Sequence, residues 1–274
     1  MKWIFNGELV DATTQIEPQN TTVVYEVLRV IDGIPLFWEQ HLQRLERSCT
    51  LIQSQVQPRL NKFIQNIENL IATNRLNEGN IMCKYFYGTT RIDELYSIIP
   101  HAYPTETQYQ QGVQTNLLYA ERSNPEAKII QPSLRLRANQ TMAEQNLYEV
   151  LLVNDQGLIT EGSRSNVFFI RGKQLVSAPT STILLGITFL KVVELCQKLK
   201  IEIDFTGARA SELKQFDAAF LSGTSPKILP IKTIGNQSFN PNNELLQILI
   251  QAYNAEIKAY IEIKKETIPK DGLS

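Results

Sequence analysis

EGSRSNVFFI, residues 161–170, joins a dense group of polar side chains to an apolar run. Residues 166–170 and 174–178 are predicted to form a pair of strands, and residues 148–153 form an apolar strand that ends at a turn. The polar group therefore lies between strands, in a chain that is 43% hydrophobic. Its carboxylate and hydroxyls make it a candidate for chemistry, although Glu161 taken alone is better interpreted as a turn acid.

Two other polar segments lie where an anion can bind. Residues 222–225 read SGTS and follow a short predicted strand at residues 218–221, so their amides and hydroxyls can surround a phosphate. Residues 186–188 read GIT and begin a predicted helix, whose N-terminus favours negative charge. Each signal alone is weak, because a Gly-Thr pair is most often only a turn.

The N-terminal third has the pattern of an α+β unit. Asn6-Gly7 separates two short apolar runs and predicts a hairpin, and residues 23–31 are rich in β-branched residues and predict a strand. Apolar positions from Trp38 to Ile52 repeat at spacings of four and three, which predicts a helix. We expect a second helix near residues 60–76, then strands at residues 81–87 and 96–99.

Composition narrows the class of protein. The 274 residues include 27 Lys+Arg and 28 Asp+Glu, for a net charge of −1, which gives no electrostatic reason to expect nucleic acid or an anionic membrane as a partner. The length suggests two domains or one large one. Three scattered cysteines and two histidines argue against a disulfide scaffold and against a metal site.

The chain also lacks the pattern of a membrane or secreted protein. It contains no run of about 18 apolar residues, and its first residues, MKWIFNGELV, meet polar groups too early for a signal peptide. We expect a soluble, cytoplasmic protein.

The order of these motifs resembles the class IV (fold type IV) pyridoxal-phosphate enzymes. That family includes branched-chain aminotransferases, D-amino-acid aminotransferases and 4-amino-4-deoxychorismate lyases. The resemblance rests on EGSRSNVFFI, on LLGIT at residues 184–188, on FLSGTSPKILPI at residues 220–231, and on residues 25–48, YEVLRVIDGIPLFWEQHLQRLERS, with their H-x-x-R-L element. It extends from Tyr25 to about Pro230.

The resemblance implies a two-domain α+β fold. Residues 1–115 would form a small N-terminal α+β domain, and residues 122–274 a larger C-terminal domain of pseudo-barrel type. An interdomain connection, from residues 116–121 to about residue 132, would carry Lys128. Family members bind pyridoxal 5′-phosphate in a cleft between such domains and are typically homodimers.

The resemblance also implies the roles of two residues. Lys128, in NPEAK, is in register with the lysine that forms a Schiff base with the cofactor and then moves the proton. No other lysine lies between Lys84 and Lys173. Glu161 would face the pyridine nitrogen and keep the ring protonated. The residues after Lys128 depart from the usual family pattern, and Ser133 stands where branched-chain enzymes have a tyrosine.

The phosphate would be held by residues from three segments. Arg44 supplies a planar guanidinium, the backbone amides of Ile187 and Thr188 donate hydrogen bonds, and Thr224 adds a hydroxyl. The alternative for Arg44 is a solvated helix face, since it lies off the apolar stripe.

Substrate contacts are less well defined in the sequence. Tyr25 matches a family tyrosine near the substrate, with simple strand packing as the alternative. Arg91 is the nearest candidate for binding a substrate carboxylate, and it reads equally well as a loop arginine.

The activity expected from the resemblance is an aminotransferase that acts on a small amino acid and a keto acid. The E-G-S-x-S-N form favours this activity. Residues 19–22, QNTT, replace the family's usual acidic-glycine stretch and count against it. The alternatives are 4-amino-4-deoxychorismate lyase, which releases pyruvate and 4-aminobenzoate, and a pyridoxal-phosphate-binding protein without turnover.

Overall fold

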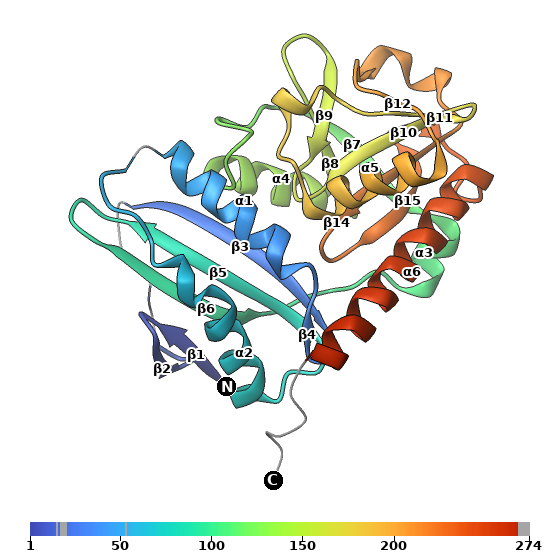
Figure 1. The fold of residues 1–274 in the computed structure, drawn as a ribbon. Helices are drawn as coiled ribbons and strands as arrows, with labels where there is room; N and C mark the ends of the chain where they lie inside the picture. The colour runs from blue at the N-terminus through green and yellow to red at the C-terminus, as the bar shows by residue number, and fades with distance from the viewer. Residues whose placement is uncertain (15, 17–20, 53, 268–274) are drawn as a thin grey trace. The chain divides into compact units, whose positions relative to one another are not determined.

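The computed structural model describes residues 1–14, 16, 21–52 and 54–267 (Figure 1). The chain forms two compact units. The first contains Met1–Ala102, Ala127–Ile130 and the chain from Ala255 onward, and the second contains Tyr103–Glu126 and Gln131–Asn254. The segment that carries Lys128 therefore belongs to the first unit. Of the QNTT stretch, Gln19 and Asn20 lie outside the described residues.

The first unit is built on a six-stranded antiparallel sheet in the order β2-β1-β6-β5-β3-β4. Its elements are β1 (Lys2–Phe5), β2 (Glu8–Asp11), β3 (Thr22–Ile31), β4 (Ile34–Pro35), α1 (Trp38–Leu51), the short η1 (Leu60–Lys62), α2 (Phe63–Asn74), β5 (Gly79–Tyr87) and β6 (Ile92–Ile99). Asn6 and Gly7 both have positive φ, 50° and 89°, as the predicted two-residue hairpin requires.

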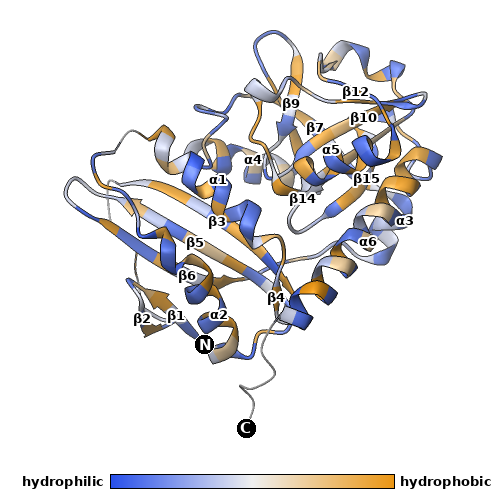
Figure 2. Cartoon of the chain, in the orientation of Figure 1, coloured by the Kyte–Doolittle hydropathy of each residue, from blue (hydrophilic) through white to orange (hydrophobic). Residues whose placement is uncertain are grey.

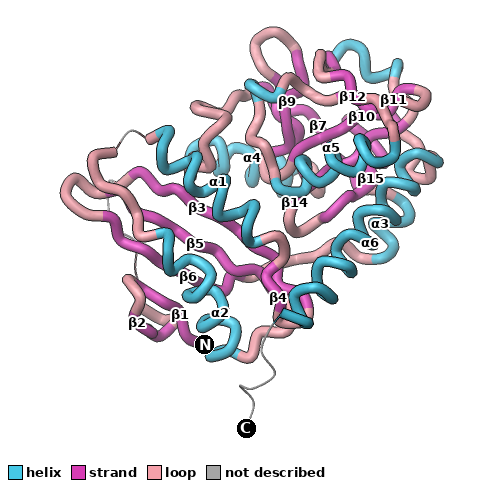
Figure 3. Tube along the Cα trace, in the orientation of Figure 1, coloured by secondary structure: helices cyan, strands magenta, loops and turns pink. Residues whose placement is uncertain are grey.

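Helices α1 and α2 lie against one face of this sheet (Figures 1 and 3). Their apolar stripes meet the strands in a core that contains Leu45, Phe63 and Ile67. Helix α1 contacts β3, the longest strand of the unit. This packing brings the polar residues of α1 that lie beside its apolar stripe against the middle of β3.

The second unit contains a ten-stranded mixed sheet in the order β12-β11-β10-β14-β15-β7-β8-β9-β13, with β16 paired to β15. Its strands are β7 (Val113–Tyr119), β8 (Glu149–Val153), β9 (Leu158–Gly162), β10 (Asn166–Arg171), β11 (Gln174–Val176), β12 (Ile203–Asp204), β13 (Ala208–Arg209), β14 (Ala218–Gly223), β15 (Lys227–Ile234) and β16 (Gln237–Ser238). Its helices are α3 (Glu106–Gln111), α4 (Pro132–Glu144), α5 (Ile187–Leu199) and the first part of α6 (Glu244–Thr267), with short η2 (Thr180–Thr182) and η3 (Ala210–Gln215).

Strands β8, β10 and β14 of the second unit are largely apolar (Figure 2). Phe168 stacks between Phe189 of α5 and Phe220 of β14, with ring centroids 4.8 and 5.1 Å apart. Because this stack fixes α5 on β10 and β14, it also fixes the N-terminus of α5, where an anion site is predicted.

The sequence predicted the first unit's sheet and helices closely and the second unit less completely. Helices α3 and α4 and the strands β7, β9 and β15 were not predicted. Helix α4 buries only Ala138 and Met142, so its apolar stripe is too narrow to show as a period. No helix among the described residues is long and apolar enough to cross a membrane.

Candidate functional site

Lys128 is fastened to β3 by its own backbone. Its carbonyl accepts a hydrogen bond from the amide of Tyr25 (3.1 Å), and its amide donates to the Ser48 hydroxyl on α1 (3.1 Å). The next residue, Ile129, forms a bridge with Val24. The backbone of the predicted nucleophile is therefore paired with β3 much as an additional strand would be, and it is not a loose linker. A reacting lysine needs this rigidity.

The Lys128 side chain lies over the Tyr25 ring, with Nζ 4.5 Å from the ring centroid. At this distance the ammonium is attracted by the ring's negative face. Tyr25 is 8% exposed. The structure thus brings together the two residues that the sequence assigned to reaction and to substrate.

Arg44 is buried in a polar cluster of the first unit and does not lie on a solvated face, so that alternative is wrong. Its Nε and Nη2 donate to the two carboxylate oxygens of Glu26 on β3, at 2.8 and 2.6 Å. His41, one turn earlier on α1, places Nδ1 2.7 Å from the same carboxylate. Glu26 thereby fixes the plane of the guanidinium.

Charge in this cluster is balanced by pairing. Burial alone would raise the pKa of Glu26, but the charge and hydrogen bonds of Arg44, helped by His41, outweigh it and lower that pKa to about 2. Burial lowers the pKa of His41 despite the neighbouring carboxylate. A neutral His41 then donates from Nδ1 to Glu26, since an ionised carboxylate only accepts.

Arg91 lies in the turn between β5 and β6. Its side chain is 77% exposed, and its Nε lies 3.3 Å from Asp93 Oδ2. Among the described residues of the first unit, no hydrogen bond or ion pair joins the Arg91 side chain to Lys128.

In the second unit Glu161 is the penultimate residue of strand β9 and is 4% exposed, so the polar group begins inside a strand and not between strands as the sequence predicted. Its Oε1 lies 3.5 Å from Nε of Arg122, and its Oε2 accepts a hydrogen bond from the amide of Leu184 (3.4 Å). The Arg122 side chain is itself 8% exposed, and its Nε and Nη2 form no hydrogen bond within the described residues. The buried carboxylate of Glu161 therefore lies next to the buried guanidinium of Arg122, two of whose nitrogens can still donate hydrogen bonds.

The polar turn after Glu161 is held by a second buried acid, Glu149 of β8. The hydroxyl of Ser163 donates to one carboxylate oxygen of Glu149, and that of Ser165 to the other (3.2 Å). Burial raises the pKa of Glu149, against the hydrogen bonds and nearby arginines. Gly162 is required here, because a Cβ would lie 2.4 Å from the Ser165 hydroxyl.

The three polar segments of the second unit converge. Asn166, at the end of the EGSRSN turn, donates to the carbonyl of Leu184 (2.8 Å) and pairs with Ser222 in the sheet. A Cβ on Gly186 would lie 2.3 Å from Asn166 Oδ1, so only glycine allows this approach. The sequence predicted the segments, and the structure places them side by side.

Two of these segments offer polar groups that can bind an anion. Gly186 is the N-cap of α5 and offers no side-chain cap, so the first amides of the helix, from Ile187 and Thr188, depend on another acceptor. Ser222 is 1% exposed, and its hydroxyl has no hydrogen-bond partner among the described residues. Thr224 lies half-buried in the turn between β14 and β15.

These groups fit the cofactor that the sequence implies. The amides of α5 and the Ser222 hydroxyl suit a phosphate, and the buried carboxylate of Glu161 suits a protonated ring nitrogen. No group of His, Cys, Asp and Glu in the described part of the chain is arranged to hold a metal ion.

Three residues of the site were missed in the sequence. Glu26 and Glu149 stand inside apolar strands, and an acid in such a place signals a buried pair. Arg122 lies in a Pro-containing connection, where no pattern marks it.

Comparisons with known proteins identify a matching family model and several relatives. The family model described as amino-transferase class IV matches residues 23–234. A D-alanine aminotransferase of Bacillus licheniformis is 25% identical over 255 residues, which cover 87% of this chain and 90% of that protein. An aminodeoxychorismate lyase of Bacillus subtilis is 22% identical over 263 residues, or 88% and 87% of the two chains.

The fold is shared with solved structures. The branched-chain amino acid aminotransferase of Thermobaculum terrenum in its PLP form superposes with a TM-score of 0.81. It is 21% identical, and the match covers 94% of each chain.

Proposed function

Because this chain belongs to the class IV aminotransferase family, whose cofactor is pyridoxal phosphate, we propose that it moves the amino group of a small amino acid to a keto acid. The observation that carries the proposal is the meeting of Glu161, the α5 N-terminus and Ser222 around the polar turn. Similarity to a D-alanine aminotransferase over most of both chains supports it.

Each residue has a separate task in this proposal. The Lys128 amine would hold the cofactor through its aldehyde carbon, and the same amine would move the proton that leaves the amino acid. Glu161 would hold a proton on the ring nitrogen, and the neighbouring Arg122 orients the Glu161 carboxylate. Pyridoxal phosphate supplies the electron sink that makes the proton's departure possible.

The phosphate is held by groups that do not react. The amides of Ile187 and Thr188, the hydroxyl of Thr224 and the guanidinium of Arg44 are assigned to it. Tyr25 supports the Lys128 amine through its ring. Arg91 is the remaining candidate for binding the substrate carboxylate. Its side chain is exposed and pairs with Asp93, which argues against this role.

Aminodeoxychorismate lyase is the second candidate, and the Bacillus subtilis relative is the observation in its favour. Both reactions need the same lysine and carboxylate, and they differ in what leaves. A transaminase releases a keto acid and then needs an amino acceptor, whereas the lyase releases pyruvate and 4-aminobenzoate without one.

The test is a set of reactions with L- and D-amino acids and with aminodeoxychorismate, each with and without 2-oxoglutarate. A transaminase without acceptor releases at most one keto acid per active site, and it turns over repeatedly when acceptor is present. Repeated release of 4-aminobenzoate without acceptor identifies the lyase instead. Absence of both, in a chain that still binds the cofactor, contradicts both enzyme proposals.

We also propose that the chain acts as a homodimer in the cytoplasm. Light scattering of the purified protein measures the mass against the 31.2 kDa of one chain. A monomer that is fully active contradicts the dimer proposal.

A further inference from the structure

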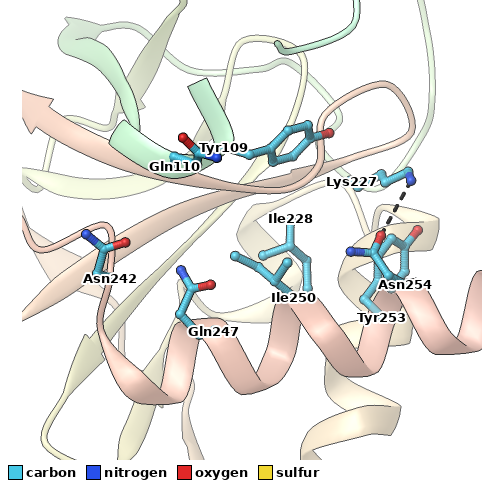
Figure 4. Close-up of a pocket in the computed structure, with 9 residues that line it drawn as sticks. All are labelled: Tyr109, Gln110, Lys227, Ile228, Asn242, Gln247, Ile250, Tyr253 and Asn254. Carbon is cyan, nitrogen blue, oxygen red and sulfur yellow. Dashed lines mark hydrogen bonds between the residues drawn. The ribbon is translucent and has the colours of Figure 1, made fainter. Parts of the chain in front are cut away.

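A separate cavity of about 280 Å³ lies within the second unit, between α3, the start of β15 and the N-terminal half of α6 (Figure 4). Small-molecule sites typically have volumes of roughly 300–1,000 Å³, so this cavity has room for a single-ring ligand. None of the residues assigned to pyridoxal phosphate lines it.

The lining has a polar group at each end and an apolar middle. Lys227 lies at one end, with its ammonium 3.4 Å from the amide oxygen of Asn254. Asn242 and Gln247 lie toward the other end, and Ile228 and Ile250 lie between the two ends (Figure 4). This order suits a ligand with a negative charge, an apolar body and a distant hydrogen-bonding group.

Lys227 is held in an unusual backbone conformation, with φ of 57°. Residues other than glycine rarely adopt this left-handed region, and such residues gather at ligand-binding and catalytic sites. Lys227 is the first residue of β15, and Figure 4 shows its side chain at the edge of the cavity, extended toward Asn254.

The cavity wall also touches two of the segments assigned to the cofactor phosphate. Tyr109 donates a hydrogen bond to the carbonyl of Pro226 (2.9 Å), which lies in the same turn as Thr224. The hydroxyl of Tyr253 lies 3.3 Å from Thr188 Oγ1. A ligand bound between these two tyrosines can therefore affect both the turn that carries Thr224 and the start of α5 that carries Thr188.

We propose that this cavity is a second ligand site, which binds a small carboxylic acid with an apolar or aromatic body and a hydrogen-bonding group at its far end. Lys227 binds the carboxylate, and the amides of Asn242 and Gln247 bind the far group. Through Tyr109 and Tyr253, the bound acid changes cofactor affinity. This second part rests on the proposed function, whereas the binding itself does not.

The probe is 4-hydroxybenzoate, with the uncharged 4-hydroxybenzamide as its control, titrated calorimetrically into the full-length protein. We expect saturable binding at millimolar or lower concentration, weakened about tenfold for the amide probe. Lys227→Gly removes the ammonium and suits the left-handed backbone, so folding is preserved while binding weakens about tenfold. Ile250→Trp fills the cavity and should abolish binding. Lys232→Ala, an exposed lysine of the same strand, is the matched control and should bind like the wild type.

Failure of the wild type to bind, or equal binding by wild type and both cavity variants, overturns the site. The second part is tested by repeating the titration with and without saturating pyridoxal phosphate. Because coupling between two ligands is reciprocal, a probe affinity that depends on the cofactor supports it. An unchanged affinity overturns the coupling and leaves the site itself standing.

Discussion

Glu26 holds the buried guanidinium of Arg44 in a fixed plane, in which it can bind an anion. If Arg44 binds the cofactor phosphate, Arg44→Ala should weaken cofactor affinity by about one to two decades, and Arg44→Lys should restore part of it by keeping the charge without the fork. Turnover at saturating cofactor should change much less, since the phosphate does not react. A cofactor titration of activity measures both quantities.

Stability must be followed in the same variants. Removing Arg44 leaves Glu26 buried without its guanidinium partner, which typically costs about 3–5 kcal/mol. Arg47→Ala, at an exposed arginine of the same helix, is the control. Lowered stability with unchanged cofactor affinity would mean that Arg44 serves only the fold.

Glu161 is predicted to act on the chemistry more than on binding. Glu161→Gln keeps the side-chain volume but removes the charge that holds a proton on the ring nitrogen, so turnover should fall far more than cofactor affinity. The two are separated by measuring kcat and cofactor affinity, with Glu202→Gln on the exposed surface as control. If only affinity falls, Glu161 has a structural role alone.

The EGSRSN turn is held in place by Glu149, a carboxyl whose pKa is raised by burial. A raised pKa in the folded state means that the stability contributed by the protonated acid is complete below the unfolded value of 4.5 and is lost as pH rises through the folded value. Glu149→Gln imitates the protonated acid and should remove this loss, whose slope is at most about 1.4 kcal/mol per pH unit.

Unfolding free energies of wild type and Glu149→Gln across pH 4–8 provide the measurement, with Glu202→Gln as the surface control. Parallel curves for wild type and Glu149→Gln would contradict a raised pKa. Because Glu149 binds Ser163 and Ser165 and not the cofactor, this result is independent of the assigned function.

The elements that were predicted correctly carry strong local signals. The Asn6-Gly7 hairpin, the stripe of α1 and the glycine before α5 each depend on a few neighbouring residues. Strand β7 was missed because its place is set by parallel pairing with β8 and β15, which are distant in the sequence. The convergence of the three polar segments is of the same long-range kind, and only the family resemblance suggested it in advance.

Residue partners were harder to predict than residue positions. The resemblance located Arg44 and Glu161 by register, but only packing and distance showed that Glu26 is the partner of Arg44 and Arg122 the neighbour of Glu161. A buried pair depends on which strand a helix covers, and no sequence period encodes this.

The account of the whole molecule depends on Lys128, because both enzyme proposals need this amine. The direct measurement is to incubate the full chain with pyridoxal phosphate, reduce it with borohydride, digest it and locate the phosphopyridoxyl group by mass spectrometry. Lys128→Ala serves as the matched variant. We predict a visible absorption band that reduction removes, a label on the peptide that contains Lys128, and no band or label in the variant, which stays folded. A label on another lysine, or an unchanged band in Lys128→Ala, would contradict the assignment.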